Sequence, residues 1–315
     1  MGRASKGPGR RTLCTSRLNF DVTIGFVTSA ELGSITADDA LVAAELADAG
    51  VGVQPVFWDG GEPPESIEAL VLRSPWNYHL APETFLAWVD RAGESAAVCN
   101  DPQIVRWNSH KGYLLELQRA GIPVAETVLC KKNSVSDLRA IMRERDWTQV
   151  VVKPAISASS FMTCIVGLPE HATHAASDLR GRVVADGQHL LESILQTRDA
   201  LVQPFMPEIF ERGERCLIFI EGQFSHAVQK APFTNLPGGG RAVIAEPAEI
   251  RIGQNALSAL TQTPLYARVD LLRGNDGVDR LMELELIDPE LYLRFDSDSP
   301  RRFASALLRR LNVAK

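Results

Sequence analysis

Three carboxylates near the C-terminus, Asp270, Glu283 and Glu285, constrain the fold of this chain more than any other feature. They lie on two predicted strands, 266–273 and 278–287, which a short Gly-Asn-Asp-Gly turn joins. A hairpin with so short a turn sets its strands side by side, and residues two apart on a strand point to the same face. Glu283 and Glu285 therefore share a face, and Asp270 can come opposite them. Three carboxylates on one apolar sheet face repel each other unless a cation lies between them.

Magnesium suits this predicted cluster, because Mg²⁺ takes oxygen ligands and keeps coordination positions open for phosphate oxygens. Arg268 lies two residues before Asp270, so it points to the same face and adds a fixed positive charge. The alternative is a solvated hairpin face with ordinary charges. The hairpin alone thus predicts either a metal site or an exposed charged surface.

The first part of the chain alternates strands with helices. Strands are predicted at 22–27, 51–57 and 69–73, and helices at 36–49, 82–92 and 109–120. Thr36 is the expected N-cap of the first helix, and Gly50 ends it. Strand, helix and strand at this spacing predict a parallel αβ layer.

A second αβ unit is predicted from residue 124, and antiparallel pairing is expected only after residue 205. The unit contains strands at 124–130, 149–153 and 201–205 and helices at 135–145 and 187–196. Strands at 216–220 and 223–229, joined by Glu221-Gly222, form a predicted hairpin, and a helix at 301–311 closes the chain. We therefore expect an α/β protein that is α+β in its C-terminal half.

Length and composition limit the class of protein. A chain of 315 residues is expected to form two or three domains. Its net charge of −6 argues against nucleic acid as a partner, and no apolar run approaches the roughly 18 residues that a membrane span needs. Five cysteines without a CxxC pair indicate reduced thiols. Residues 1–17 are basic and lack an apolar segment, which predicts a disordered tail and no signal peptide. We expect a cytoplasmic protein.

The predicted strand at 149–153 ends in a charged residue, Lys153, followed by Pro154 and a run of small and hydroxylated residues at 155–160. A lysine at the end of a buried strand lies at the mouth of a site, and such a run can fold over an anion with backbone N–H groups and hydroxyls. A solvated lysine before a plain turn explains the pattern as well. The chain contains no GxxxxGK[ST] motif, so a P-loop is excluded.

In order along residues 105–290, these motifs resemble the ATP-grasp ligases, a superfamily that includes D-alanine–D-alanine ligase and glutathione synthetase. The similar segments are Lys111, the VVKP motif that ends at Pro154, LVQPF at 201–205, RGER at 212–215 and RVD…MELE at 268–285. The intervals of 13 and 15 residues from Asp270 to the two glutamates agree with the metal motif of the superfamily. The resemblance implies an ATP-grasp fold. Its parts would be an N-terminal parallel αβ domain at 18–108, a central subdomain with a lid at 109–200, and a C-terminal subdomain with the adenine linker strand and the metal site at 201–315.

The resemblance also implies roles for the residues around ATP. Lys111 and Lys153 would hold the phosphates, together with the lid residues Ser157, Ser159 and Ser160. Gln203 and Phe205 would lie beside the adenine, and Glu214, with Glu208 as its rival, would accept from the ribose hydroxyls. For Lys111 and Glu214 a surface charge is the alternative, and for Phe205 a place in the core.

For the chemistry, the resemblance implies that Asp270, Glu283 and Glu285 bind two Mg²⁺ ions, which Mn²⁺ can replace. Arg268 would stabilise the phosphoryl group in flight, and it would act with Lys153 and Lys230 as the catalytic set. Cations around a transferring phosphoryl group neutralise the charge that develops there.

Residues for the second substrate are predicted at a strand end and beside a loop. Arg73 ends the strand at 69–73, and Trp76 and Asn77 follow it; Arg73 can pair with a substrate carboxylate through two hydrogen bonds. Packing of Trp76 between domains is the alternative. Lys230 and Arg241 flank the loop at 231–240 and are expected to face the substrate or the γ-phosphate.

Three segments, at 73–78, 106–117 and 224–230, are most similar to a bacterial branch that includes the cyclo-ligase of D-cycloserine biosynthesis. This type of enzyme closes O-ureido-D-serine onto its own activated carboxylate. The resemblance implies an ATP-dependent ligase that converts a small amino-acid-like carboxylate into an acyl phosphate for attack by nitrogen, with release of ADP and phosphate. An intermolecular carboxylate–amine ligase and a small-molecule kinase are the alternatives. ATP and the substrate are the expected partners, and the chain is compatible with a homo-oligomer.

Overall fold

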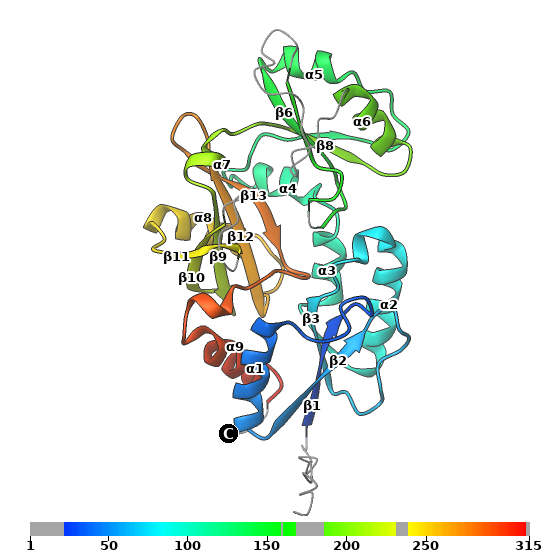
Figure 1. The fold of residues 1–315 in the computed structure, drawn as a ribbon, viewed down its shortest axis with the longest axis vertical. Coiled ribbons are helices and arrows are strands. Elements are labelled where there is room, and N and C mark those ends of the chain that lie inside the picture. The colour runs from blue at the N-terminus through cyan, green and yellow to red at the C-terminus, as the bar shows by residue number, and fades with distance from the viewer. Residues whose placement is uncertain (1–21, 159, 168–185, 231–238, 313–315) are drawn as a thin grey trace, which may run out of the picture.

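The computed structural model of the chain describes residues 22–158, 160–167, 186–230 and 239–312. The predicted tail at 1–17, Ser159 and most of the loop at 231–240 lie outside the described residues. Three sheets are stacked along the long axis of the molecule, with the N-terminal sheet at the bottom of Figure 1, the C-terminal sheet in the middle and the central sheet at the top.

The N-terminal sheet is parallel, as predicted, with the strand order β2-β1-β3-β4. Its strands are β1 (Val22–Thr28), β2 (Val51–Phe57), β3 (Ala69–Ser74) and β4 (Ala97–Cys99). Helix α1 (Ala37–Asp48) begins after Thr36, whose hydroxyl accepts from the backbone N–H of Asp39 as the predicted cap. Helix α2 (Pro82–Ser95) packs on the opposite face of the sheet. The alternation of side chains along β1 explains the two faces, because Phe26 packs with α1 and Val27 packs with α2.

The C-terminal helix α9 (Ser299–Arg310) returns to this N-terminal sheet. Phe303 and Leu307 share a core with Val42 and Leu46 of α1, and the two helices lie side by side in Figure 1. The last segment of the chain therefore joins the N-terminal part to the C-terminal part through one apolar core.

The central sheet is antiparallel throughout, which corrects our expectation that antiparallel pairing begins after residue 205. It has the order β5-β8-β6-β7, with β5 (Val128–Cys130), β6 (Gln149–Pro154), β7 (Cys164–Gly167) and β8 (Ala200–Pro204). Helices α5 (Leu138–Glu144) and α6 (Gly187–Leu195) pack against its core. Strands β6 and β7 are joined without a helix, and a parallel pair needs a long crossover. The predicted strand at 124–130 is wrong in length, because Val124 instead bridges to Leu281 of the next sheet.

The C-terminal sheet is antiparallel, as predicted, with the order β11-β10-β9-β12-β13. Its strands are β9 (Glu214–Ile220), β10 (Gln223–Lys230), β11 (Arg241–Val243), β12 (Tyr266–Arg273) and β13 (Asp279–Glu285). Glu221 and Gly222 have φ values of 48° and 73°, as a two-residue hairpin loop requires. The short helix α7 (Glu208–Glu211) precedes β9.

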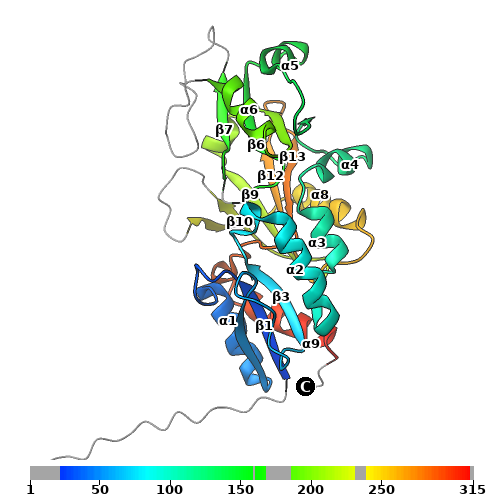
Figure 2. The ribbon, with the colours of Figure 1, turned by 90° about the vertical axis from the view of Figure 1, so that its right-hand side faces the viewer.

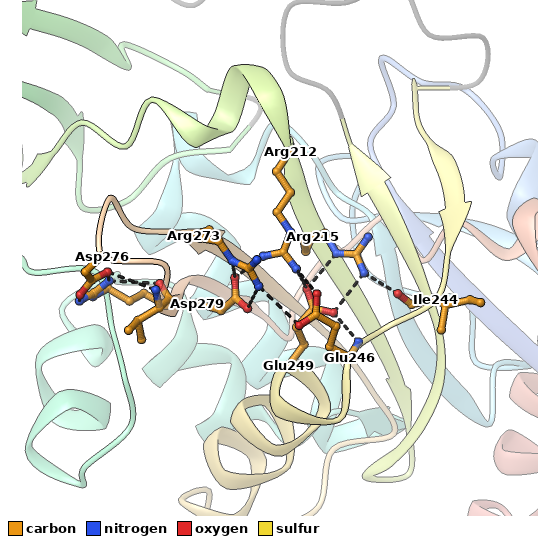
Figure 3. Close-up of polar contacts among 10 residues, drawn as sticks. Arg212, Arg215, Ile244, Glu246, Glu249, Arg273, Asp276 and Asp279 are labelled. Carbon is orange, nitrogen blue, oxygen red and sulfur yellow. Dashed lines mark hydrogen bonds and ion pairs between the residues drawn. The ribbon is translucent and has the colours of Figure 1, made fainter.

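Helix α8 (Pro247–Ser258), which the sequence analysis missed, covers one face of the C-terminal sheet. A Cβ atom on Gly253 would come within 2.5 Å of the Phe219 ring, so glycine lets the helix pack close. A charged cluster also holds α8 (Figure 3). Glu249, fully buried, accepts hydrogen bonds from Arg212 at 2.8 Å and from Arg215 at 2.9 and 3.1 Å. Arg212 also pairs with Asp279 at the start of β13.

The predicted helix at 109–120 is instead part of a pair of helices, α3 (Pro102–Asn108) and α4 (Tyr113–Arg119), which lead upward from the N-terminal sheet in Figure 2. Asp101 caps α3 with Pro102 in its first turn. The helix is interrupted because the backbone N–H of Lys111 donates to the carbonyl of Ala155 at 2.8 Å. This break brings Lys111 to the central sheet. Over the described ranges, no helix is long and apolar enough to cross a membrane.

Candidate active site

A cavity of about 580 Å³ is lined by residues of the central and C-terminal sheets and by Trp76 and Tyr78, which follow β3 of the N-terminal sheet. Its polar part is lined by Lys111, Lys153, Glu214, Lys230, Arg268, Asp270, Glu283, Glu285, Asp288 and Glu290. Most of the side chains that we predicted for the nucleotide, the metal and the catalytic set therefore come together, although they are spread over more than 170 residues of sequence. The size suits a small molecule of the nucleotide class.

The acidic hairpin, formed by β12 and β13, has the predicted register. Asp270 lies opposite Glu283, and Arg268 lies opposite Glu285. Arg268 is 4% exposed. It donates two hydrogen bonds of 2.8 Å to Asp270, and it pairs with Glu285 at 2.5 Å. Lys111 pairs with Glu283 at 3.1 Å. The predicted metal carboxylates therefore lie on one face, and each has a cation beside it.

Burial and pairing shift the pKa values of this cluster in opposite directions. Burial raises the pKa of Glu285 well above its ordinary value, and Arg268 offsets only part of this rise. For Glu283, Lys111 and Lys153 outweigh the effect of burial and hold its pKa below the ordinary value. The pKa of Arg268 is raised despite its burial, because Asp270 and Glu285 favour the charged form.

The donor set fits a magnesium ion. Asp270, Glu283 and Glu285 offer only oxygen atoms, which are the ligands that Mg²⁺ takes. Asp270 also lies within 4.8 Å of possible ligand atoms of Glu214 and Cys216. Burial raises the pKa of the Cys216 thiol well above its ordinary value, so the thiolate form that binds metals is disfavoured. The oxygen atoms remain the candidates for a hard cation.

Two lysines approach the acidic hairpin from the central part of the molecule. Lys111 donates to the carbonyl oxygen of Ser157 at 2.6 Å. Lys153, at the end of β6, is 6% exposed, and its burial lowers its pKa. Ser157 and Ser160 line the cavity beside them. The predicted phosphate-binding role stays a prediction for all four residues, and their positions are compatible with it.

Lys230 and Glu214 form a second pair at 3.2 Å, on neighbouring strands β10 and β9. Glu214 raises the pKa of Lys230 well above its ordinary value. Glu214 lies close to Asp270, so this carboxylate borders the metal candidates. The ribose role that the resemblance implies for Glu214 remains a prediction. Glu208 lies on α7 and is not among the lining residues.

The opposite end of the cavity is apolar and suits a planar base. It is lined by Val151, Ile165, Phe205, Met206, Ile209, Leu272 and Met282. Phe205 follows β8, where we predicted the adenine to lie. Gln203 is fully buried, and its amide donates to the hydroxyl of Thr127 at 2.8 Å. Its side chain is not among the residues that line the cavity, so adenine contact through that side chain is not supported.

Three residues predicted for the second substrate lie outside the cavity lining. Arg73 is buried, and its Nε pairs with Asp39 at 2.7 Å. Asn77 forms hydrogen bonds with Trp58 and Asp59. The substrate-binding role of both residues stays a prediction, although neither residue lines the cavity.

Arg241 and Trp76 complete the predicted substrate set. Arg241 is exposed and donates to Gln229 at 2.7 and 2.9 Å, and it does not line the cavity. Trp76 does line the cavity, and its indole N–H donates to the carbonyl of Asp288 at 3.2 Å. Trp76 thus combines a place in the cavity wall with the interdomain contact that we kept as the alternative.

Sequence analysis missed the segment after β13, which contributes Asp288, Glu290 and Tyr292 to the cavity. Its Asp-Pro-Glu sequence resembles an ordinary exposed turn, and no periodicity marks it. Tyr292 has a left-handed φ of 51°, which is uncommon for a bulky residue. The ring of Tyr292 faces the guanidinium carbon of Arg268 at 5.7 Å.

Comparison with known proteins agrees with this geometry. A family model described as the N-terminal domain of the D-cycloserine synthetase DcsG matches residues 24–100. The cycloserine biosynthesis protein DcsG of Streptomyces lavendulae is 29% identical over 281 residues, covering 83% of this chain and 90% of that protein. The crystal structure of the D-cycloserine synthetase DcsG superposes with a TM-score of 0.79 at 26% identity, covering 92% of this chain and 99% of the other.

More distant structures show the fold alone. The ATP-grasp ligase PsnB, solved with its minimal precursor, Mg and ADP, has a TM-score of 0.60 at 17% identity over 93% of this chain and 100% of its own. The D-alanine–D-alanine ligase of Bacillus anthracis, solved with ATP, has a TM-score of 0.61 at 13% identity over 92% of this chain and 97% of its own. The predicted resemblance is confirmed. The chain is therefore a homologue of the D-cycloserine synthetase DcsG, it has the ATP-grasp fold, and it is an enzyme of the ligase class.

Proposed function

We propose that this chain uses ATP and Mg²⁺ to activate the carboxylate of a small amino acid as an acyl phosphate, which a nitrogen atom then attacks. A carboxylate is a poor electrophile, and phosphorylation supplies the leaving group that attack by an amine requires. The observation that carries the proposal is one cavity in which Lys111, Lys153 and Arg268 border three carboxylates and an apolar end.

Each group of side chains has its own role in this proposal. Lys111 and Lys153 bind the phosphates and neutralise their charge, and the planar fork of Arg268 holds the phosphoryl group during transfer. Asp270, Glu283 and Glu285 would hold two magnesium ions, whose positive charge polarises the phosphoryl oxygens; Mn²⁺ is expected to replace them. The apolar end accepts the adenine.

The reaction proposed is intramolecular ring closure, in which O-ureido-D-serine supplies both the carboxylate and the attacking nitrogen, and phosphate leaves the acyl phosphate. Water removes the carbamoyl group from that nitrogen as carbon dioxide and ammonia, so that a D-cycloserine-type ring with a free N–H forms. The similarity to DcsG over 83% of the chain supports this choice. The structural similarity to DcsG, over 92% of this chain, and the family model that matches residues 24–100 support it as well.

The test is a product analysis with O-ureido-D-serine, ATP and Mg²⁺. We expect ADP and inorganic phosphate, and with hydroxylamine present we expect a hydroxamate from interception of the acyl phosphate. AMP and pyrophosphate would overturn the acyl-phosphate mechanism. A rate that requires two different amino acids would favour an intermolecular carboxylate–amine ligase, and a stable phosphoester as product would indicate a kinase.

A further inference from the structure

The backbone after β13 is held by an unusual series of hydrogen bonds. The carbonyl oxygens of residues 287–291 accept in turn from the side chains of Tyr266, Trp76, Arg73, Arg268 and His226, at 2.9, 3.2, 3.4, 3.2 and 3.0 Å. The donors come from the N-terminal sheet region and from strands β10 and β12. We call residues 287–292 the acceptor wall. Its backbone is fixed from both sides, so the side chains that it presents to the cavity are preorganised.

Asp288 and Glu290 are the two carboxylates of the acceptor wall, and their surroundings differ. Glu290 pairs with Arg294 at 2.6 Å. None of the ion pairs among the described residues includes Asp288, although its carboxylate lines the cavity. Lys111 and Arg268 are near enough to act on its charge, but both are paired with other carboxylates. Burial is the main cause that raises the pKa of Asp288, to about 6. A cation beside this carboxylate would relieve the cost of burying its charge.

Aromatic rings flank the same part of the cavity. Trp76 touches the acceptor wall through its hydrogen bond to Asp288, and Tyr78 lines the cavity next to it. A carboxylate in a cavity wall that also contains aromatic rings is a favourable environment for an ammonium group. A second carboxylate or a phosphate would be repelled there by Asp288 and Glu290.

We propose that Asp288 binds the free ammonium group of the substrate, so that the enzyme acts on amino acids with an unblocked α-amine and discriminates against simple carboxylic acids. This inference rests on the proposed function. In an α-amino acid one carbon separates the ammonium group from the reacting carboxylate. A substrate whose carboxylate lies among Lys111, Arg268 and the acidic hairpin therefore brings its ammonium group close to Asp288.

The test compares two substrates in two variants. The substrates are O-ureido-D-serine and 3-(carbamoylaminooxy)propanoate, which is the same molecule without its amine. Asp288→Asn is expected to raise the KM for O-ureido-D-serine about 10- to 100-fold, because a buried charge-assisted pair is lost. It should change turnover of the amine-free analogue by less than about 3-fold, and leave the KM for ATP and the half-saturating Mg²⁺ concentration unchanged. Asp298→Asn is the matched control, since Asp298 lies on the same stretch of chain but is exposed, and Arg301 is its ion-pair partner among the residues that the structure describes.

The outcomes separate this inference from the function on which it rests. Equal losses for both substrates in Asp288→Asn would overturn it, and a shift in the Mg²⁺ dependence would identify Asp288 as a metal ligand instead. Asp288→Glu, which keeps the charge, should keep the preference for the amine, and it serves as the second variant if the amide does not fold. If the wild-type protein releases no ADP with either substrate or with any other amino acid, the proposed function is overturned as well.

Discussion

Replacing Glu249 by Gln should strongly destabilise the C-terminal sheet, although Glu249 is not in the cavity. Its carboxylate is fully buried and is the only ion-pair partner of Arg215 among the described residues, while Arg212 has other carboxylate partners. It also accepts from the backbone N–H of Glu246 at 2.7 Å. Glutamine keeps the size of the side chain but removes the charge, and its NH₂ group would face guanidinium donors. Arg215, 7% exposed, would then lack a counter-charge.

The expected loss is about 3–5 kcal/mol in the free energy of unfolding, which is typical when one partner of a buried ion pair is removed. Glu246→Gln is the matched control, because Glu246 belongs to the same cluster but its side chain is 55% exposed. Exposed pairs contribute about 1 kcal/mol or less. Urea unfolding followed by tryptophan fluorescence and circular dichroism measures both variants, and a shift in midpoint at unchanged slope gives the difference. If Glu249→Gln costs no more than Glu246→Gln, the buried pair is not what holds α8, and this reasoning fails.

Four further variants test the site. Glu283→Gln and Asp270→Asn should each abolish ATP turnover and also cost stability, because they break the pairs with Lys111 and with Arg268; near-wild-type ADP release from both at saturating Mg²⁺ would exclude them as metal ligands. Lys153→Ala should weaken binding of ATP more than binding of adenosine, because its proposed contact is a charge pair with phosphate; calorimetry that gives equal losses would move Lys153 out of the phosphate site. Arg268→Lys should lower kcat by about 10²–10³-fold with little change in ATP affinity, since an ammonium cannot replace a planar fork at the transferring group; an unchanged kcat would contradict this role.

The acidic hairpin could be predicted from sequence because its geometry is local. A short turn brings Asp270 close to the two glutamates, as expected, and a register shift between Asp270 and Leu271 then sets Asp270 opposite Glu283. The direction of the central strands could not be predicted in this way. The sequence of residues 149–153 predicts a buried strand in a parallel sheet as well as in an antiparallel sheet. Only the path of the chain to β7 decides between the two kinds of pairing.

Arg73 and Asp288 show what sequence reasoning about the site could not foresee. Arg73 lies at a strand end, a position typical of ligand-binding residues, but its Nε pairs with Asp39 of helix α1 and it does not line the cavity. For Asp288 the reverse holds. It lines the cavity, but its Asp-Pro turn gives no sequence signal of that position. Both outcomes depend on contacts between segments far apart in the sequence, and composition and periodicity contain no information about those contacts.

The charges of the cavity explain how an acidic cluster can be built into a largely apolar sheet. Asp270 and Glu285 are neutralised by Arg268, and Glu283 is neutralised by Lys111. These two cations are the groups that the proposed function assigns to the phosphates. Binding of phosphate and binding of Mg²⁺ would therefore be coupled, because each cation that moves to a phosphate frees a carboxylate, which the metal then binds. The three carboxylates of the acidic hairpin would then keep a cation beside them in both states, which avoids the large cost of an unpaired ion in the interior. The same side chains thus support folding in the free protein and chemistry in the loaded one.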